Sequence, residues 1–219
     1  MKKPIIALNF KVFKESFEKN ELLIRSAKEV SETYGIRIIV CPSTALLKHS
    51  VNLYHDVFAQ SVDVELGQFT GTNPIEGMKL IGIKGSLINH SENKITLNKI
   101  FRLVEIAKKI DFETIVCTAN NDESKAIANF SPKMIAVEPP DLIGTGISVS
   151  TAKPEVVESS VQAVKNVNKS IIVLCGAGIT NANDVKKAIE LGAEGVLLAS
   201  AYVKAKDPKI LLESYAKVV

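Results

Sequence analysis

The segments Glu113-Thr-Ile-Val-Cys117 and Lys133-Met-Ile-Ala-Val137 are two short apolar runs separated by a helix-forming stretch, Asp122 to Ala128. Continuous apolar runs of this length are typical of parallel strands that are covered on both faces. A strand, a helix and a second strand in this order predict a βαβ unit with a right-handed crossover. The segment therefore places the fold in the α/β class.

The same alternation extends over almost the whole chain. Further strands are predicted at Ile5–Asn9, Ile36–Val40, Val57–Ala59, Gly85–Ile88, Ile171–Leu174 and Gly195–Leu198. Further helices are predicted at Ser16–Tyr34, from Thr44, at Ile95–Ile110, Lys153–Val167 and Asn183–Leu191, and from Pro208. Roughly eight strand–helix units favour a closed (β/α)8 barrel over an open doubly wound sheet. Because no linker or low-complexity segment interrupts them, residues 1–219 are predicted to form a single domain.

The composition excludes several classes of function. A hydrophobic content of 46% with 23% charged residues is that of a globular protein. The formal net charge of +3 is too small to indicate nucleic-acid binding, and no long run of like charges is present. The sequence therefore predicts no nucleic-acid partner, while small phosphate-bearing ligands remain compatible with the charge.

The first residues have the basic opening of a signal peptide, but the apolar run that follows stops at Asn9. A run of about five apolar residues is too short for a signal sequence or a membrane span. We expect a soluble, cytoplasmic protein with no membrane partner.

The cysteines and histidines do not suggest a metal site. Three cysteines lie in or at the end of apolar runs: Cys41, Cys117 and Cys175. Three histidines lack the paired spacing of zinc ligands: His49, His55 and His90. We expect the cysteines to be reduced thiols in the core and predict no metal ligands.

The residues after Lys133–Val137 suggest chemistry. Glu138 stands where this strand leaves the core, followed by two prolines and then by Gly144 and Gly146. Prolines stiffen the exit, whereas glycines absorb large dihedral changes. A carboxylate at the mouth of a core beside a hinged segment suits a general base under a lid. Taken alone, the segment is equally compatible with an ordinary loop that carries a solvated glutamate.

Other polar residues follow other predicted strands, and a barrel brings all carboxyl strand ends to one rim. Asn9 and Lys11 follow the first strand and, by alternation, point the same way. His90 is the one histidine at a predicted strand end, where its imidazole could donate a hydrogen bond to a substrate oxygen. A surface lysine and a histidine packed under the rim are the alternative interpretations.

Small residues follow the last two strands. The turns Gly176-Ala-Gly178 and Ala199-Ser200 allow backbone amides to approach an anion, and the loops after strands seven and eight form the recurrent phosphate site of such barrels. Neither Gly176-Ala-Gly178 nor Gly144-Thr-Gly146 continues as a dinucleotide-binding fingerprint. A phosphate site is therefore favoured over a Rossmann site.

Taken together, these segments resemble the triosephosphate isomerase family over essentially the whole chain. The matching segments are Asn9-Phe-Lys11, Phe69-Thr-Gly71, Asn89-His-Ser-Glu92, Ala136-Val-Glu-Pro139, Ile143-Gly-Thr-Gly146 and Cys175-Gly-Ala-Gly178. The short chain and its Gly-Ala-Gly and Ala-Ser turns are similar to the archaeal branch, whose members assemble as tetramers. The resemblance implies interconversion of dihydroxyacetone phosphate and D-glyceraldehyde 3-phosphate in glycolysis and gluconeogenesis.

The resemblance also implies residue roles, which are those long established for this family. Glu138 would be the base, neutral His90 would polarise the carbonyl, and Lys11 would supply positive charge. Residues expected to bind substrate are Asn9, Lys11, Ile143, Gly144, Gly178, Ala199 and Ser200. Ser91 and Glu92 would support the catalytic groups. No metal or organic cofactor is expected, because a base and a hydrogen-bond donor cover both proton movements.

The chain departs from the family pattern at several places. Cys175-Gly-Ala-Gly178 and Ala199-Ser200 replace the common Tyr-Gly-Gly-Ser and Gly-Gly turns. Asp141 stands where the lid usually has tryptophan, and Asn93 stands where an arginine is frequent. These differences concern lid packing and phosphate hydrogen bonds and leave the three chemical groups in place.

Two other functions fit parts of the pattern. An aldose–ketose isomerase for a larger sugar phosphate would usually pair acids at its strand ends, whereas this chain offers Lys, His and Glu. A catalytically silent barrel that binds phosphate metabolites would not need these three residues together. An isomerase assay with substrates of different size separates these possibilities.

The length also suggests an assembly. The chain is shorter than the roughly 250 residues of a typical barrel, so some outer helices must be reduced. Uncovered flanks are expected to be buried against other copies. We expect a homo-oligomer, a tetramer built from dimers, in which the Gly67–Pro74 loop with exposed Phe69 lies at an interface.

Overall fold

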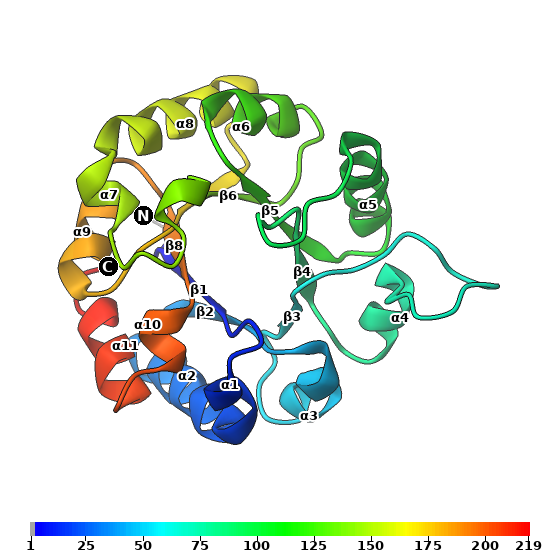
Figure 1. Ribbon diagram of the computed structural model, residues 1–219, viewed down its shortest axis with the longest axis horizontal. Coiled ribbons are helices and arrows are strands. Elements are labelled where there is room, and N and C mark those ends of the chain that lie inside the picture. The colour runs from blue at the N-terminus through cyan, green and yellow to red at the C-terminus, as the bar shows by residue number, and fades with distance from the viewer. Residues whose placement is uncertain (1–2) are drawn as a thin grey trace.

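The computed structural model describes residues 3–219 as a barrel of eight parallel strands surrounded by helices (Figure 1). The strands are β1 (Ile5–Asn9), β2 (Arg37–Cys41), β3 (Phe58–Ala59), β4 (Gly85–Ile88), β5 (Glu113–Thr118), β6 (Met134–Val137), β7 (Ile172–Cys175) and β8 (Gly195–Leu198). Their order is β2-β1-β8-β7-β6-β5-β4-β3. A parallel bridge between Val40 and Val57 joins the two ends of this order, and Val40 N donates to Asp56 O at 3.1 Å. The predicted (β/α)8 barrel is confirmed.

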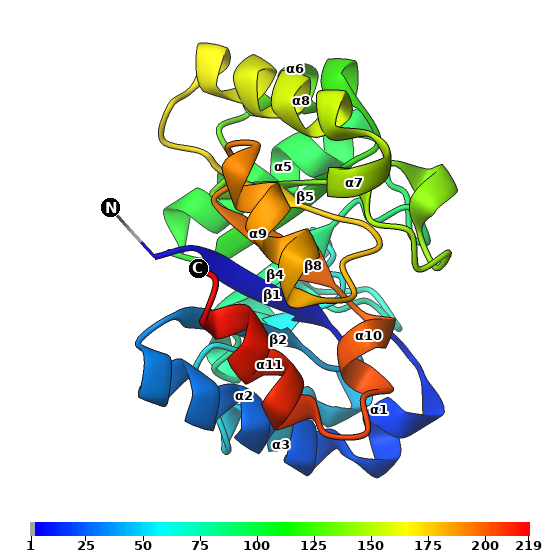
Figure 2. The ribbon, with the colours of Figure 1, turned by 90° about the vertical axis from the view of Figure 1, so that its left-hand side faces the viewer.

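The helices lie outside the strands and separate them from solvent (Figures 1 and 2). They are α1 (Lys14–Glu18), α2 (Asn20–Tyr34), α3 (Leu47–Val51), α4 (Ile75–Leu80), α5 (Leu97–Lys109), α6 (Asn121–Ala128), α7 (Val149–Ala152), α8 (Pro154–Val167), α9 (Ala182–Glu190), α10 (Ser200–Val203) and α11 (Pro208–Ala216). Two 3-10 turns, η1 (Thr44–Leu46) and η2 (Pro140–Leu142), occur in the loops. No helix in the described part of the chain combines the length and apolar character that a membrane crossing requires.

Several helix boundaries have a clear local cause. Gly35 ends α2 in the left-handed region at φ 60°, a conformation that glycine adopts without a Cβ clash. The Thr96 side chain accepts a hydrogen bond from Lys99 N at the start of α5. Asn181 and Asp184 form a reciprocal capping box at the start of α9. These caps fix where the chain enters and leaves its helices.

Some elements differ from the sequence-based prediction. The single helix predicted at Ser16–Tyr34 is two helices, α1 and α2, separated at Lys19, whose φ of −114° is not helical. Helices α4, α7 and α10 were not predicted, because four to six residues carry too little periodicity to be recognised. Helices α3 and α4 have only five and six residues, so the reduced outer helices lie on this side of the barrel.

Alternation along the strands divides the core into two layers. Residues such as Ile5, Ala7 and Ala136 point into the barrel, whereas their neighbours Ile6 and Val137 pack against the helices. The interior layer also contains Ile39, Cys41, Phe58, Leu87, Ile115, Cys117, Met134, Leu174 and Leu197. All three cysteines are buried free thiols, as expected. The interior is therefore a packed core that ends in polar residues at the carboxyl ends of the strands.

The amino ends of the strands are closed by ion pairs. Arg37 Nε and Nη2 donate to Asp56 at 2.7 and 2.9 Å, and Nη1 and Nη2 donate to Glu113 at 2.9 and 3.0 Å. The side chain of Asp56 is only 7% exposed. A buried carboxylate without a partner is costly. Arg37 therefore holds together the starts of β2 and β5 and Asp56, which lies two residues before β3.

Replacing Arg37 by methionine should lower the free energy of unfolding by about 3 kcal/mol, because the variant leaves the buried Asp56 carboxylate unpaired. Chemical denaturation followed by circular dichroism measures this loss. The control is Arg25→Met, which removes an exposed pair with Glu21 and should cost less than about 0.5 kcal/mol. Equal losses in the two variants would contradict this role of Arg37.

Candidate active site

Glu138 continues the inward-facing row of β6, two residues beyond Ala136. Its backbone N–H donates to Thr118 O at 2.8 Å and extends the β5–β6 ladder by one residue. The side chain is 8% exposed and lies at the mouth of the barrel interior. The strand register, more than the loop sequence after it, therefore fixes the position of this carboxylate.

The carboxylate of Glu138 fits closely against neighbouring strands. A Cβ added at Gly176 would lie 3.0 Å from Glu138 Cγ and Oε1 and 2.9 Å from Leu197 O. Burial raises the pKa of Glu138 above the ordinary glutamate value, and His90, a hydrogen bond from Cys117 and the charge of Lys11 offset this only in part. Glu138 Oε2 accepts no hydrogen bond from residues 3–219. A desolvated carboxylate with a free oxygen is equipped to accept a proton.

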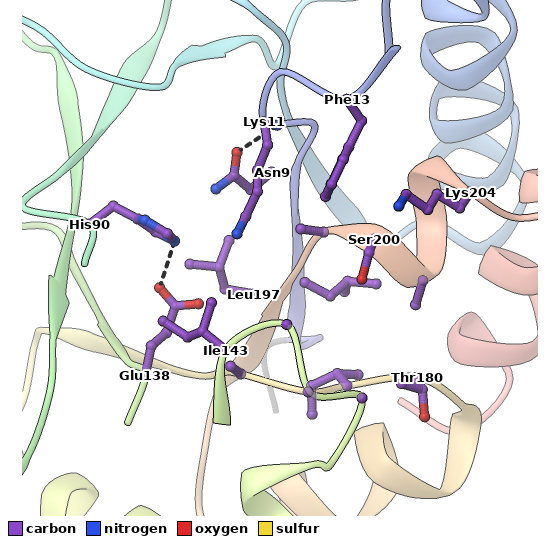
Figure 3. Close-up of a pocket in the computed structure, with 18 residues that line it drawn as sticks. Asn9, Lys11, Phe13, His90, Glu138, Ile143, Thr180, Leu197, Ser200 and Lys204 are labelled. Atoms are coloured by element: carbon purple, nitrogen blue, oxygen red, sulfur yellow. Dashed lines mark hydrogen bonds and ion pairs between the residues drawn. The ribbon is translucent and has the colours of Figure 1, made fainter. Parts of the chain in front are cut away.

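His90 faces Glu138 from the loop after β4 (Figure 3). Its Nε2 lies 3.5 Å from Glu138 Oε2, and both side chains are less than one-tenth exposed. The backbone N–H of Glu92 donates to His90 Nδ1 at 3.2 Å. Because Nδ1 accepts this bond, a neutral His90 carries its proton on Nε2, which points at the cavity.

The loop that carries His90 is held by Asn89. Asn89 adopts a left-handed conformation at φ 60°, and its Nδ2 donates to Cys117 O and to Glu123 Oε1, each at 3.0 Å. Its Oδ1 accepts from Ile95 N at 3.2 Å. Burial disfavours the Glu123 carboxylate, but hydrogen bonds from Lys94 and the Ala119 backbone outweigh it and lower the pKa of Glu123. This network ties the loops after β4 and β5 together.

Lys11 reaches the cavity by a different route from the one predicted. Strand β1 ends at Asn9, so strand alternation does not orient Lys11. Instead Lys11 lies in a left-handed turn at φ 48°, in which its N–H donates to Asn9 Oδ1 at 3.0 Å. Gln60 Nε2 donates to Lys11 O at 2.9 Å and to Cys41 O at 3.0 Å. This turn directs the ammonium group of Lys11 into the cavity (Figure 3).

Glu92 and Ser91 lie beside these groups without lining the main cavity. Glu92 Oε1 accepts from Lys11 Nζ at 2.6 Å, and Glu92 Oε2 lies 3.5 Å from His90 Nδ1. Ser91 lines a smaller space next to Glu138 and Cys117. Glu92 therefore joins the loops that carry Lys11 and His90 and neutralises part of the charge of Lys11.

One cavity of about 330 Å³ brings the predicted residues together. Of these, Asn9, Lys11, His90, Glu138, Ile143, Gly144, Gly178, Ala199 and Ser200 all line it. The lining also includes residues that were not predicted: Phe13, Gly146, Ala177, Ile179, Thr180, Leu197, Leu198, Ala201 and Lys204. Glu138, His90 and Lys11 lie at one end of the cavity, and Phe13, Ser200 and Lys204 lie at the other (Figure 3).

The lid segment that follows Glu138 makes its tertiary contacts at its C-terminal end, near Ile147 and Val149. It makes few contacts at its tip, between Gly144 and Gly146. Gly144 and Gly146 have φ of 78° and 75°, and added Cβ atoms there would touch nothing within 4 Å. By contrast, a Cβ on Gly178 would lie 1.9 Å from Ile147 O, and Val149 N donates to Ala177 O at 3.1 Å. The tip is therefore open, whereas the C-terminal end of the segment packs on the turn after β7.

Asp141 does not line the cavity and pairs with Lys153, just before α8. This hydrogen bond lowers the pKa of Asp141, whose side chain is 59% exposed. The lid position of Asp141 therefore holds an ion pair. It joins the two ends of the segment from Pro139 to Lys153.

Some residues that shape the site were not predicted from the sequence, because they support it through contacts with residues distant in the chain. Gly176 is needed because Glu138 lies against it, and Gln60 and Asn89 orient neighbouring loops. The one local signal was the position of Gly176 and Asn89 directly after predicted strands. Within residues 3–219, no group of three or more His, Cys, Asp or Glu side chains is arranged to hold a metal ion.

Comparisons with known proteins identify similar sequences over the full length. The family model described as triosephosphate isomerase matches residues 4–216. A triosephosphate isomerase of Methanothermus fervidus is 51% identical over 216 residues, which cover 97% of each chain. Those of Methanobrevibacter smithii and Methanocaldococcus jannaschii are 50% and 48% identical, with 100% and 98% of this chain and 100% of each relative covered.

Burial of Glu138 has a measurable effect on stability. Because burial raises its pKa in the folded state, ionising Glu138 costs free energy of unfolding as pH rises through that pKa. Glutamine keeps the shape and does not titrate. Glu138→Gln should therefore be more stable than the parent at neutral pH, and the difference should shrink as pH falls toward the ordinary glutamate pKa. Denaturant midpoints across this pH range measure it, and a difference independent of pH would contradict the desolvated carboxylate.

Proposed function

This chain belongs to the triosephosphate isomerase family, and we propose that it moves the proton between the two carbons of its substrate through an enediol(ate), with Glu138 as the base. The reaction of the family interconverts dihydroxyacetone phosphate and D-glyceraldehyde 3-phosphate. The observation that carries the proposal is the 3.5 Å approach of Glu138 Oε2 and His90 Nε2 at the closed end of the cavity. We expect the enzyme to act in the cytoplasm.

Glu138 suits the role of base because of its burial and its free oxygen. The raised pKa makes the carboxylate a stronger base than a solvated glutamate, while His90, the Cys117 thiol and Lys11 favour its ionised form in part. Oε2 has no donor among residues 3–219, so it can take a carbon-bound proton and return it to the adjacent carbon. A single carboxylate between two neighbouring carbons can serve both half-reactions.

His90 suits the role of hydrogen-bond donor. The Glu92 N–H that binds Nδ1 leaves Nε2–H directed at the space beside Glu138. A donor held in this way would stabilise the negative charge that develops on the substrate oxygen as Glu138 removes the proton. Since the substrate has oxygens on both carbons, the same imidazole can pass a proton between them.

Lys11 suits the role of fixed positive charge. Its side chain is 16% exposed and is held by Glu92 and by the turn that Asn9 and Gln60 stabilise. An ammonium in a partly desolvated site stabilises an enediolate more than it would in water. Glu92 limits its mobility, so its position changes little when substrate binds.

The small residues at the other end of the cavity suit the phosphate group. Gly178, Ala199 and Ser200 leave backbone amides accessible, and Ile143 and Gly144 can approach from the lid. Closure of Pro139–Gly146 would exclude water from the enediolate, which otherwise loses phosphate. The glycines at the tip supply the required dihedral freedom, and the anchored end at Val149 supplies a fixed pivot.

Replacing Glu138 by glutamine should lower kcat at least about a hundredfold, because the amide cannot accept the proton, while KM changes little. A coupled assay with dehydrogenase and glyceraldehyde 3-phosphate measures both constants. The matched control is Glu190→Gln on the exposed face of α9, which should keep parental activity. Near-normal turnover of Glu138→Gln would remove Glu138 as the base.

We further propose that the protein assembles as a tetramer built from two dimers, with the Gly67–Pro74 loop at an interface. Figure 1 shows this loop projecting from the barrel beside α4, and Phe69 on it is 58% exposed. A hollow of about 200 Å³ next to Lys11 and Glu92 offers a receiving site on a second copy. Exposed Leu80, Leu97 and Phe101 on adjacent α4 and α5 supply apolar area for a second contact.

If Phe69 enters a neighbouring subunit, Phe69→Asp should shift the protein toward smaller species and lower its activity, because the receiving hollow adjoins Lys11. Light scattering coupled to size exclusion measures the mass. Val12 is an exposed residue that lines the receiving hollow, so Val12→Asp should have the same effect by altering the surface that binds Phe69. A fully active monomeric parent would contradict the assembly.

A further inference from the structure

Lys204 is a lysine at the rim of the cavity that the family motifs do not include. It follows α10 directly, one helical turn after Ser200, and lines the cavity together with Ala199 and Ser200. Its side chain runs back toward the cavity, and Nζ lies 4.6 Å from the centroid of the Phe13 ring (Figure 3). The ammonium group therefore lies at the end of the cavity opposite Glu138.

The charge of Lys204 is not compensated by the protein. The acidic and basic side chains that line the cavity, apart from His90, are Lys11, Glu138 and Lys204. Lys11 and Glu138 belong to one cluster with Glu92, in which opposite charges are close. No ion pair or hydrogen bond to another residue of 3–219 engages Lys204 Nζ, and its contact with Phe13 is through the face of the ring. The phosphate end of the cavity thus carries a free positive charge.

The contact with Phe13 holds this charge without neutralising it. A cation over an aromatic face is attracted by the ring quadrupole, weakly enough at an exposed site to be exchanged for an anion. Lysine has a flexible stem and a compact charge, so Nζ can move from the ring to an oxygen in the cavity. Phe13, on the loop after β1, holds the ammonium at the rim of the cavity.

We propose that Lys204 is a specificity-determining residue that binds the phosphate dianion of the substrate as the side-chain counterpart to the backbone amides of Gly178, Ala199 and Ser200. The inference rests on the proposed function, which places the phosphate at this end of the cavity. Lys204 would attract the dianion before binding and donate a charge-assisted hydrogen bond to it afterwards. Phe13 acts as a positioning residue for Lys204.

The test compares Lys204→Met and Lys204→Gln with Lys206→Met. Lys206 lies two residues further on, is exposed and does not line the cavity, so its replacement removes the same charge from the surface alone. Two readouts are needed: KM and kcat for glyceraldehyde 3-phosphate, and the dissociation constant of inorganic phosphate measured by calorimetry without substrate. Both Lys204 variants should raise KM and the phosphate dissociation constant about tenfold with kcat nearly unchanged. Lys204→Arg should restore most of the phosphate affinity.

Several results would overturn the proposal. Phosphate dissociation constants and KM values that match those of Lys206→Met would show that Lys204 does not contact the phosphate. A fall in kcat alone, with phosphate affinity unaltered, would do the same. Because calorimetry needs no turnover, a parent protein without isomerase activity would refute the proposed function while the phosphate measurement still decides the role of Lys204.

Discussion

The burial of one carboxylate at the mouth of the barrel governs the organisation of the site. Glu138 is held by the ladder bond from its N–H to Thr118 O, and its side chain fits against the bare backbone of Gly176. Taking this carboxylate out of water costs stability and raises its pKa. In the proposed mechanism, the same desolvation that costs stability makes Glu138 an effective base.

The remaining groups complete this arrangement from other strands. The Glu92 N–H orients His90, the Asn89 network fixes the loop that carries it, and the left-handed turn at Lys11 brings a positive charge into the cavity. Each contact joins loops that follow different strands. The arrangement of these side chains therefore depends on the closed barrel. Short loops are enough to bring the side chains together, because the carboxyl ends of the strands already meet at one rim.

The sequence predicted the fold because its signals were local and repeated. Strands β4 and β8 were predicted with the bounds that the structure shows, since each begins at a glycine and ends in apolar residues. Gly35 marked the end of α2 for an equally local reason. Helices of four to six residues, such as α4 and α10, were not predicted, because packing against neighbouring elements determines where they form.

The sequence predicted the ionisable side chains of the candidate site, but it did not predict the residues that position them. Lys11, His90 and Glu138 follow strands and match a family pattern, so one-dimensional reasoning finds them. The reason given for Lys11 was wrong, because a left-handed turn orients it and strand alternation does not. Gly176, Gln60 and Lys204 matter through residues distant in the sequence, and only the folded chain shows those contacts.

The central claim is that one buried carboxylate transfers the proton between neighbouring carbons. Its most direct test is to convert glyceraldehyde 3-phosphate in heavy water with the unaltered protein and to locate deuterium in the product by NMR. A proton held on Glu138 can exchange with solvent before it is returned, so deuterium should appear at carbon 1 of dihydroxyacetone phosphate, on one face only. Deuterium on both faces of carbon 1 would indicate more than one base and would contradict this account.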